Sequence, residues 1–246
     1  AQMFARCGVE VTIVCRTRLL PETEPEISAA LTGYPRDEGI AVRDGLSYKE
    51  IRKTDNGVAL DVTEDGQKAT IEAEQVLVST GRKPNTDGLG LKEAGADLLP
   101  NGGIKVDDRM RTTKLGVYAV GDVTGRDQFV YMAAYGAKIA AKNAMNGDSF
   151  VYDNSAMPWV VFTDPQVAGV GLSEAAAKEH GFDVKTSSIT LEHVPRALAA
   201  RDTRGLIKLV ADTKTNKLLG AQLLAPEGAA SLQTPVLPIQ PRPPVP

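Results

Sequence analysis

Two short motifs contain side chains whose types and order could support ligand binding. Residues 80–85 (Thr-Gly-Arg-Lys-Pro-Asn) follow an apolar run, and Gly121-Asp122 follows a second predicted strand, residues 116–120. A carboxylate at the carboxyl end of a strand lies where open α/β sheets bind ligands, and it can accept hydrogen bonds there. The alternative is that Asp122 is an ordinary turn aspartate that caps the next segment. The order of the two motifs favours the ligand-binding interpretation.

Two arginines follow a predicted strand near the start of the chain. Residues 9–15 alternate and are rich in β-branched side chains, which is typical of a strand. Arg16 comes directly after it and Arg18 two residues later. In a dinucleotide-binding fold an acid at this position binds the ribose 2′-hydroxyl, whereas an arginine accommodates a 2′-phosphate bidentately. The pair therefore favours NADPH over NADH, and the alternative is that both are ordinary surface arginines.

The cysteines and histidines indicate no redox or metal chemistry. Cys7 and Cys15 are the only two cysteines, and their spacing fits neither a Cys-x-x-Cys pair nor a zinc knuckle. We interpret both as small, half-buried hydrophobic residues, one at a helix end and one at a strand end. His180 is predicted to end a helix and His193 to lie in a loop, too isolated to form a metal site. We expect the acidic pairs to be solvated rather than to act as acid and base: Glu72 with Glu74, and Asp107 with Asp108.

Periodicity and turn signals predict the elements that position these residues. Predicted helices cover residues 1–6, 24–32 and 132–145, and a further one begins at Ser173-Glu174, where Ser173 caps the free amides. Besides residues 9–15 and 116–120, the predicted strands are 40–43, 47–53, 57–63, 68–73, 75–79, 159–162, 166–171, 184–190, 206–211 and 217–224. Turn signals at 55–57 and 64–66 separate strands of a meander, and 212–216 reads as a hairpin connection. The early part is therefore predicted to be a parallel α/β unit followed by an antiparallel meander.

Length and composition set limits on the class of protein. With 246 residues and 42% hydrophobic content, the chain can form two or three modest domains. The net charge is −3 and the basic residues are dispersed, which argues against a nucleic-acid partner. No apolar run approaches the roughly 20 residues that cross a bilayer, and the first residues lack a signal-peptide pattern. We therefore predict a cytoplasmic protein with no membrane partner.

The two motifs, in this order, resemble the signatures of the flavoprotein disulfide reductases, the class I pyridine nucleotide-disulfide oxidoreductases. Further segments narrow the resemblance to the mercuric reductase family and its close relatives: residues 128–131 (Gln-Phe-Val-Tyr), 157–168, 194–199 and 202–210. The resemblance covers residues 1–234. It implies an α/β fold, namely a partial two-dinucleotide-domain flavoprotein disulfide reductase fold plus an α+β dimer-interface domain.

The resemblance also implies a domain organisation. Residues 1–79 correspond to the C-terminal part of the NADPH-binding domain, 80–148 to the second segment of the FAD-binding domain, and 149–234 to a partial dimerisation domain. Residues 235–246 are predicted to be an irregular, proline-rich tail, because each proline removes a backbone donor and clashes with the preceding turn. The glycine-rich nucleotide turn is expected just before Ala1, so we expect the chain to be a fragment.

Cofactor-binding residues follow from the same resemblance. Those implied for NADPH are Arg16 and Arg18, and those implied for FAD are Thr80, Gly81, Arg82, Gly121, Asp122, Gln128, Phe129 and Val130. In this family the aspartate holds the ribityl chain of the flavin. The helix that follows Val130 points its N-terminus at the pyrimidine end of the flavin, where its dipole stabilises negative charge.

The reaction that the resemblance implies needs groups that this chain lacks. NADPH reduces FAD, a Cys-x-x-x-x-Cys pair accepts the electrons, and its thiolates bind Hg(II), which becomes Hg(0). A second cysteine pair from the partner subunit of a homodimer delivers the metal. None of these four cysteines is present, so no catalytic or metal-binding residue is assigned and the chain alone is expected to be inactive.

Two alternatives remain open from the sequence. The first is a fragment of a dihydrolipoamide dehydrogenase-like disulfide reductase, although that class usually carries an acid near position 16 and a His-Glu pair near its C-terminus, and both are absent here. The second is a non-catalytic binding module that uses the interface domain and the proline-rich tail.

Overall fold

The computed structural model describes residues 1–239 and divides into two compact units. Unit 1 combines residues 1–76 with the C-terminal part from Ser155 onwards, and unit 2 is the continuous segment Leu77–Asn154. Segments from the first and third predicted domains therefore share one unit. The predicted four-part division of the chain stays a prediction.

Unit 1 begins with a small parallel α/β arrangement. Its elements are α1 (Gln2–Arg6), β1 (Thr12–Val14), α2 (Pro25–Asp37) and β2 (Ala41–Arg43). β1 and β2 pair in parallel, with Ile13 opposite Val42, which confirms the predicted parallel unit. β1 is shorter than the predicted strand, because only three of its residues find a partner. α2 is longer than predicted, because Pro35 is accommodated near its end.

An antiparallel meander follows, as predicted. Its strands are β3 (Ser47–Thr54), β4 (Gly57–Glu64) and β5 (Gln67–Ala73), which pair in sequence order. The first turn depends on a glycine, since Gly57 has φ +150° and a Cβ there would lie 2.3 Å from the Ala73 carbonyl oxygen. Asp65 and Gly66, both at positive φ, form the second turn.

The C-terminal part of unit 1 is an antiparallel sheet with short helices. Its strands are β6 (Pro158–Val161), β7 (Gln166–Gly171), β8 (Val184–Thr190), β9 (Leu206–Asp212) and β10 (Leu218–Ala225). Its helices are α5 (Glu174–Glu179), η2 (Leu191–His193), α6 (Pro195–Ala200), α7 (Gly228–Ser231) and α8 (Gln233–Ile239). The strand order is β6-β7-β10-β9-β8, and the predicted β9–β10 hairpin is confirmed.

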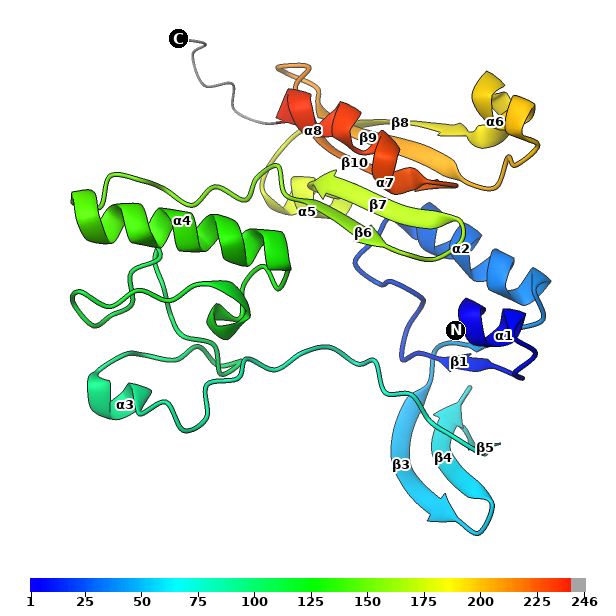
Figure 1. Ribbon diagram of the computed structural model, residues 1–246. Helices are drawn as coiled ribbons and strands as arrows, with labels where there is room; N and C mark the ends of the chain where they lie inside the picture. Colours follow the sequence, from blue (N-terminus) through cyan, green and yellow to red (C-terminus); the bar gives the residue numbers. More distant parts are fainter. Residues whose placement is uncertain (240–246) are drawn as a thin grey trace. The chain divides into compact units, whose positions relative to one another are not determined.

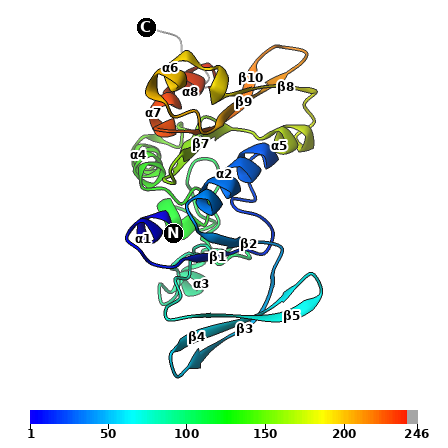
Figure 2. The same cartoon turned by 90° about the vertical axis from the view of Figure 1, so that its right-hand side faces the viewer.

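Helices cover both faces of this sheet (Figures 1 and 2). Because successive side chains of a strand point to opposite faces, neighbouring residues contact different helices. Val167 and Leu224 pack in a buried cluster with α2, whereas Ala168 and Leu223 pack in another with α8. A helix from the N-terminal segment thus forms part of the core beneath the C-terminal sheet.

Unit 2 consists mainly of loops packed around one long helix. It contains α3 (Leu91–Ala94), the 3-10 helix η1 (Gly121–Thr124) and α4 (Val130–Asn146). α4 confirms the predicted helix and starts two residues earlier. Isolated backbone bridges join its loops: Leu98 with Ile104, Val106 with Thr112, and Arg111 with Tyr118.

Two predicted strands are wrong, and both lie in or beside unit 2. Residues 75–79 form no strand, and the side chains of Leu77 and Val78 are 75% and 66% exposed. An apolar run becomes a strand only when another backbone pairs with it, and no strand among the described residues does so. Residues 116–120 likewise make only the isolated bridge at Tyr118.

The predicted irregular tail is wrong at its beginning. α8 runs to Ile239 and accommodates Pro235 in its first turn, where a missing backbone donor costs little, and Pro238 near its end. The rest of the predicted tail, residues 240–246, lies outside the described residues.

Several local predictions are confirmed, and two need correction. The Ser173 hydroxyl caps α5 by accepting from the Ala176 amide at 3.2 Å, and His180 ends that helix. Cys15 is partly buried as expected, whereas Cys7 is exposed because it follows a surface helix. His193 ends η2 instead of lying in a loop.

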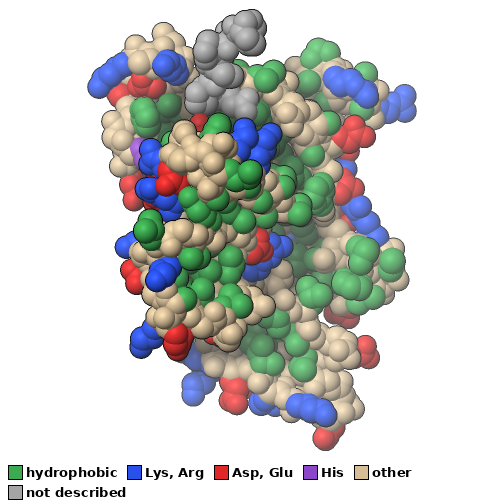
Figure 3. Space-filling model, turned by 60° about the vertical axis from the view of Figure 1, so that its left-hand side comes forward, with side chains coloured by type: hydrophobic (Ala, Val, Ile, Leu, Met, Phe, Trp, Pro, Cys, Tyr) green, Lys and Arg blue, Asp and Glu red, His purple; other side chains and the backbone are tan. Residues whose placement is uncertain are grey.

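The surface carries charges of both signs. On the face drawn in Figure 3, Lys and Arg side chains are interspersed with Asp and Glu side chains, and hydrophobic side chains lie between them. Among the described residues, no helix combines the length and apolar character needed to cross a membrane.

Candidate cofactor site

An open hollow in unit 2 brings together residues from both sequence motifs. Its volume is about 540 Å³. The residues that line it are Arg82, Asp122, Gln128, Phe129, Val130, Tyr131 and Ala133. Five of the eight residues predicted to bind FAD therefore lie around one cavity, while Thr80, Gly81 and Gly121 lie outside its lining.

Arg82 connects the first motif to the other segments of the hollow. Its Nη1 donates to the Gln128 carbonyl oxygen at 2.8 Å and lies 3.8 Å from Asp122 Oδ2. Both charged side chains are more than half exposed, so this long ion pair contributes little to stability. It leaves the Asp122 carboxylate accessible to a ligand.

Gly121 allows the segment that carries Asp122 to approach α4 closely. It has φ +75°, in the left-handed region, and a Cβ on it would lie 3.0 Å from the Ala133 Cβ. The Thr124 hydroxyl donates to the Gly121 carbonyl oxygen at 2.8 Å and stabilises the turn. Asp122 thus projects from η1 and not from a strand end, which corrects the predicted element.

The N-terminus of α4 forms another wall of the hollow. Its N-cap residue, Phe129, provides no side-chain hydrogen bond, and the first turn contains no acid. The first-turn amides and the helix dipole give this end a partial positive charge, which favours electron-rich ligands. The rings of Phe129 and Tyr131 stack with centroids 5.4 Å apart. Burial, with a smaller contribution from Asp127, raises the pKa of the Tyr131 hydroxyl above its ordinary value.

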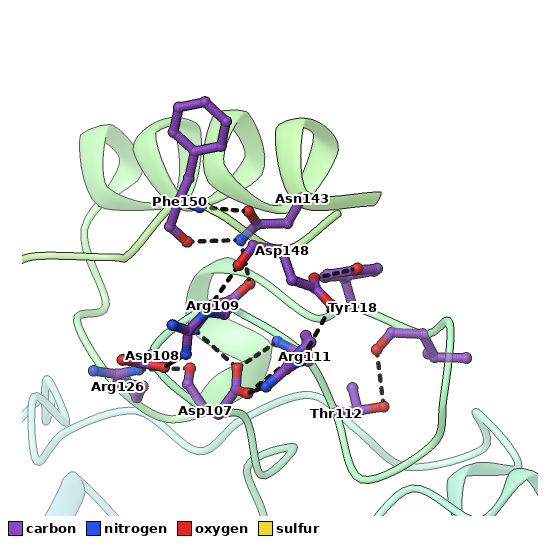
Figure 4. Close-up of polar contacts among 11 residues, drawn as sticks. Asp107, Asp108, Arg109, Arg111, Thr112, Tyr118, Arg126, Asn143, Asp148 and Phe150 are labelled. Carbon is purple, nitrogen blue, oxygen red and sulfur yellow. Dashed lines mark hydrogen bonds and ion pairs between the residues drawn. The ribbon is translucent and has the colours of Figure 1, made fainter. Parts of the chain in front are cut away.

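The opposite end of α4 is anchored by a buried amide (Figure 4). Asn143 is 1% exposed, and its Nδ2 donates to the carbonyl oxygens of Arg109 at 3.0 Å and Phe150 at 2.8 Å. Its Oδ1 accepts from the Phe150 amide at 2.8 Å. Every polar atom of this side chain is therefore paired, and α4 is fixed to the loops on both sides of it.

An ion-pair network extends this anchor (Figure 4). Arg111 pairs with Asp107 at 2.6 Å and with Asp148 at 3.1 Å, and Tyr118 donates to Asp148 at 2.7 Å. Partial burial disfavours ionisation of Asp107, but hydrogen bonds from Arg111 and nearby amides outweigh it and lower its pKa. Asp107 is therefore part of a structural network, which corrects the expectation of a solvated acidic pair.

The two arginines predicted to select the nucleotide lie in unit 1 and differ in their contacts. Arg16 is exposed, with its guanidinium carbon 6.0 Å from the centre of the Tyr48 ring. Arg18 donates through Nη2 to the carbonyl oxygens of Pro21 at 2.7 Å and Thr23 at 2.8 Å. Arg18 thus stabilises its own loop, whereas Arg16 presents its guanidinium to solvent.

Sequence reasoning missed two residues of the lining and the residues behind them. Tyr131 and Ala133 line the hollow, and Ala133 follows Val130 by one helical turn, so the helical period could have indicated it. Asp127 and Tyr152, which are hydrogen-bonded to each other beside this segment, gave no local signal. No cluster of three or more metal-ligating side chains occurs among residues 1–239, and both cysteines lie in unit 1.

Comparison with known proteins assigns the class. Residues 1–141 match the pyridine nucleotide-disulphide oxidoreductase family, and residues 157–242 match the dimerisation domain of the same family. The chain belongs to the pyridine nucleotide-disulphide oxidoreductase family, whose members use FAD and NAD(P)H. The resemblance inferred from the two motifs, and the fold class, are confirmed.

Within this family the chain is a homologue of mercuric reductases. It is 45% identical to mercuric reductase of Bacillus cereus over 91% of this chain and 36% of that protein. It is 42% identical to mercuric reductase of Streptomyces lividans over 95% of this chain and 49% of that protein. Among solved structures, the HOCl-induced flavoprotein disulfide reductase RclA from Escherichia coli is 30% identical with a TM-score of 0.80, over 96% of this chain and 54% of that one. The chain thus spans less than half the length of these two curated relatives.

Proposed function

We propose that the gene product carrying this chain is an FAD- and NADPH-dependent mercuric reductase. The observation that supports this best is the hollow of unit 2, where Arg82, Asp122 and residues 128–131 meet in a chain homologous to mercuric reductases. In this proposal unit 2 supplies one part of the FAD site. The C-terminal sheet supplies the dimerisation domain of a cytoplasmic homodimer.

The chemistry of the hollow fits a flavin nucleotide. The Asp122 carboxylate would accept hydrogen bonds from ligand hydroxyl groups, and the N-terminus of α4, which has no side-chain cap, would favour an electron-rich ring. Arg82 fixes the Gln128 carbonyl and so keeps the wall in place. FAD, when bound, supplies the relay of two electrons between NADPH and the acceptor.

Arg16 supports NADPH as the electron donor. Its exposed guanidinium offers a planar, bidentate match to a 2′-phosphate, and no acid adjoins it in sequence to bind a ribose hydroxyl instead. Arg18 contributes by holding the loop that follows Arg16.

Hg(II) is the proposed substrate. The reaction balances as NADPH + Hg²⁺ giving NADP⁺ + H⁺ + Hg⁰, since one hydride supplies both electrons and one proton. A soft cation requires thiolate ligands. Neither Cys7 nor Cys15 lines the hollow, so neither is assigned that role.

The test is to purify the intact gene product and measure three properties. We expect bound FAD, NADPH oxidation that depends on Hg(II) in the presence of a thiol, and release of mercury vapour. Asp122→Ala should weaken FAD binding about 10- to 100-fold, as the loss of hydrogen bonds to a charged group predicts, while Asp87→Ala, an exposed acid of the same unit, should not. NAD⁺-dependent oxidation of dihydrolipoamide without mercury reduction would instead favour the dihydrolipoamide dehydrogenase-like alternative, and a stable protein free of flavin would favour a binding module.

A further inference from the structure

The loop that carries Gln128 and Phe129 into the hollow is held from two directions. It runs from η1 to α4, and α4 has no side-chain cap to fix the point where the chain enters the helix. Arg82 holds one side through the Gln128 carbonyl oxygen at 2.8 Å. The adjacent residue, Asp127, attaches the loop to a second segment of the chain.

Asp127 is bound by the segment that follows α4. Its Oδ2 accepts from the Tyr152 hydroxyl at 2.9 Å, and both carboxylate oxygens accept from Asn154 Nδ2, at 3.1 and 2.9 Å. Its own carbonyl oxygen accepts from the Phe129 amide at 2.9 Å. Asp127 does not line the hollow, so it acts on the lining only through the backbone.

Tyr152 is a rigid donor for this carboxylate. Its side chain is 7% exposed, and its ring packs 5.2 Å from the centre of Tyr135 and 5.1 Å from the guanidinium carbon of Arg126. Its backbone amide donates to the Asp108 carbonyl oxygen at 2.7 Å. A buried hydroxyl with a fixed ring holds its acceptor in one place, because breaking the bond would leave a buried polar group unpaired.

We propose that Asp127 is a positioning residue for the flavin site, and that Tyr152 and Asn154 fix it in place. The inference rests on the proposed FAD site. Two neighbouring residues are bound to different segments, Gln128 to Arg82 and Asp127 to Tyr152, and these contacts restrain the backbone between η1 and α4. Asp127 thereby sets where Phe129 and the first amides of α4 face the ligand.

The matched variants separate this role from general stability. Asp127→Ala removes the whole anchor, Asp127→Asn keeps an acceptor for Tyr152, and Tyr152→Phe keeps the ring contacts but removes one hydrogen bond. Asp97→Ala, an exposed acid of unit 2, serves as the control. In the intact holoprotein we expect Asp127→Ala to raise the Kd for FAD about 10- to 100-fold, because it loses the hydrogen bonds from both Tyr152 and Asn154, and Tyr152→Phe about 3- to 10-fold, because it loses one.

A purely structural role would leave the spectrum of the bound flavin unchanged, so the decisive measurement is made at saturating FAD. There, Asp127→Ala should alter the visible circular dichroism and fluorescence of the flavin, and Asp127→Asn should restore most of the signal. A wild-type Kd and spectrum in Asp127→Ala would overturn the proposal. If the wild-type protein binds no FAD, the proposed function fails. Hydrogen exchange of residues 125–131 then still tests whether Asp127 holds this backbone in place. Unchanged protection of these amides in Asp127→Ala and Tyr152→Phe would overturn the proposal.

Discussion

At the scale of single residues, two arginines close in sequence serve different purposes. Arg18 is half-buried, and its guanidinium donates to two carbonyl oxygens of its own loop. Arg16 is exposed, and its guanidinium carbon lies 6.0 Å from the centre of the Tyr48 ring. This contact orients the side chain and occupies none of its hydrogen-bond donors. The sequence predicted the same role for both, because it cannot show which donors a loop will use.

This difference predicts the effect of replacing Arg16. Arg16→Glu should raise the KM for NADPH about 10- to 100-fold, since it loses a bidentate phosphate contact and adds a repelling charge. The KM for NADH should change by less than a factor of about 3, because NADH has no 2′-phosphate. The measurement is steady-state kinetics of the intact gene product with both nucleotides.

Arg18→Gln is the matched control. It should lower the melting temperature by weakening the loop, with a smaller change in the NADPH-to-NADH ratio than Arg16→Glu causes. An unchanged ratio in Arg16→Glu would contradict the assignment of Arg16 to the 2′-phosphate.

At the scale of elements, a buried lysine joins segments that are far apart in sequence. Lys208 on β9 is 4% exposed, and its Nζ contacts Glu24 at 2.9 Å, Glu174 at 2.8 Å and Glu26 at 3.0 Å. Glu24 is the N-cap of α2, and Glu174 begins α5. The start of each helix is therefore attached to the same strand.

Removing the lysine should be costly, because Glu24 is itself only 3% exposed and would remain buried without its partner. Lys208→Met should lower the free energy of unfolding by about 3–5 kcal/mol, the range for breaking a buried ion pair on one side. Lys217→Met, an exposed lysine, should change it by less than about 0.5 kcal/mol. Urea unfolding followed by circular dichroism measures both.

A double variant tests the mechanism further. Adding Glu24→Gln to Lys208→Met removes the orphaned charge and should recover part of the lost stability. No recovery would show that the lysine contributes through packing and not through its charge.

The same network predicts a pH dependence. Lys178 and Lys208 together lower the pKa of Glu174 from its ordinary 4.5 to about 2. Because the folded-state pKa lies below the unfolded one, Glu174 contributes stability above pH 4.5, and the contribution is lost as the pH falls from 4.5 toward 2. The stability difference between wild type and Glu174→Gln should therefore be largest near neutral pH and shrink at pH 3. A constant difference between pH 7 and pH 3 would contradict this assignment.

Local signals predicted most elements well, and the failures share one physical cause. α4 and α5 follow from helix-forming residues and a serine cap, and the turn at Gly57 follows from its glycine. Residues 75–79 have strand composition but no strand among the described residues pairs with them, and residues 116–120 form only the isolated bridge at Tyr118; composition alone cannot supply a partner. Strand formation depends on distant backbone, which a local pattern does not contain.

The candidate site shows the same limit. The motifs located Arg82, Asp122 and Gln128, which the fold then brings around one hollow. Asp127 and Tyr152 carry no motif, because their contact joins the segments before and after α4 and exists only in the folded chain.

At the scale of the whole molecule, the chain connects the two units at only two points. Unit 2 is one continuous segment, so the chain passes between the units only at residues 76–77 and 154–155. At the first passage the chain has no regular secondary structure, and Leu77 and Val78 expose most of their apolar side chains. Exposed backbone without ladder hydrogen bonds opens at little free-energy cost, which makes it a preferred site for proteases.

Limited proteolysis should therefore cut the chain first at this passage between the units. Thermolysin cleaves before large apolar residues, and at native conditions we expect its earliest internal cut among residues 76–78, because binding there requires no unfolding of the core. Mass spectrometry of the first fragments would locate the cut, and Leu77→Asp with Val78→Asp should slow it several-fold without changing the melting temperature. A first internal cut within α4 or the β9–β10 hairpin would contradict the prediction, since those segments are held by ladder or helical hydrogen bonds that must break before a protease can bind.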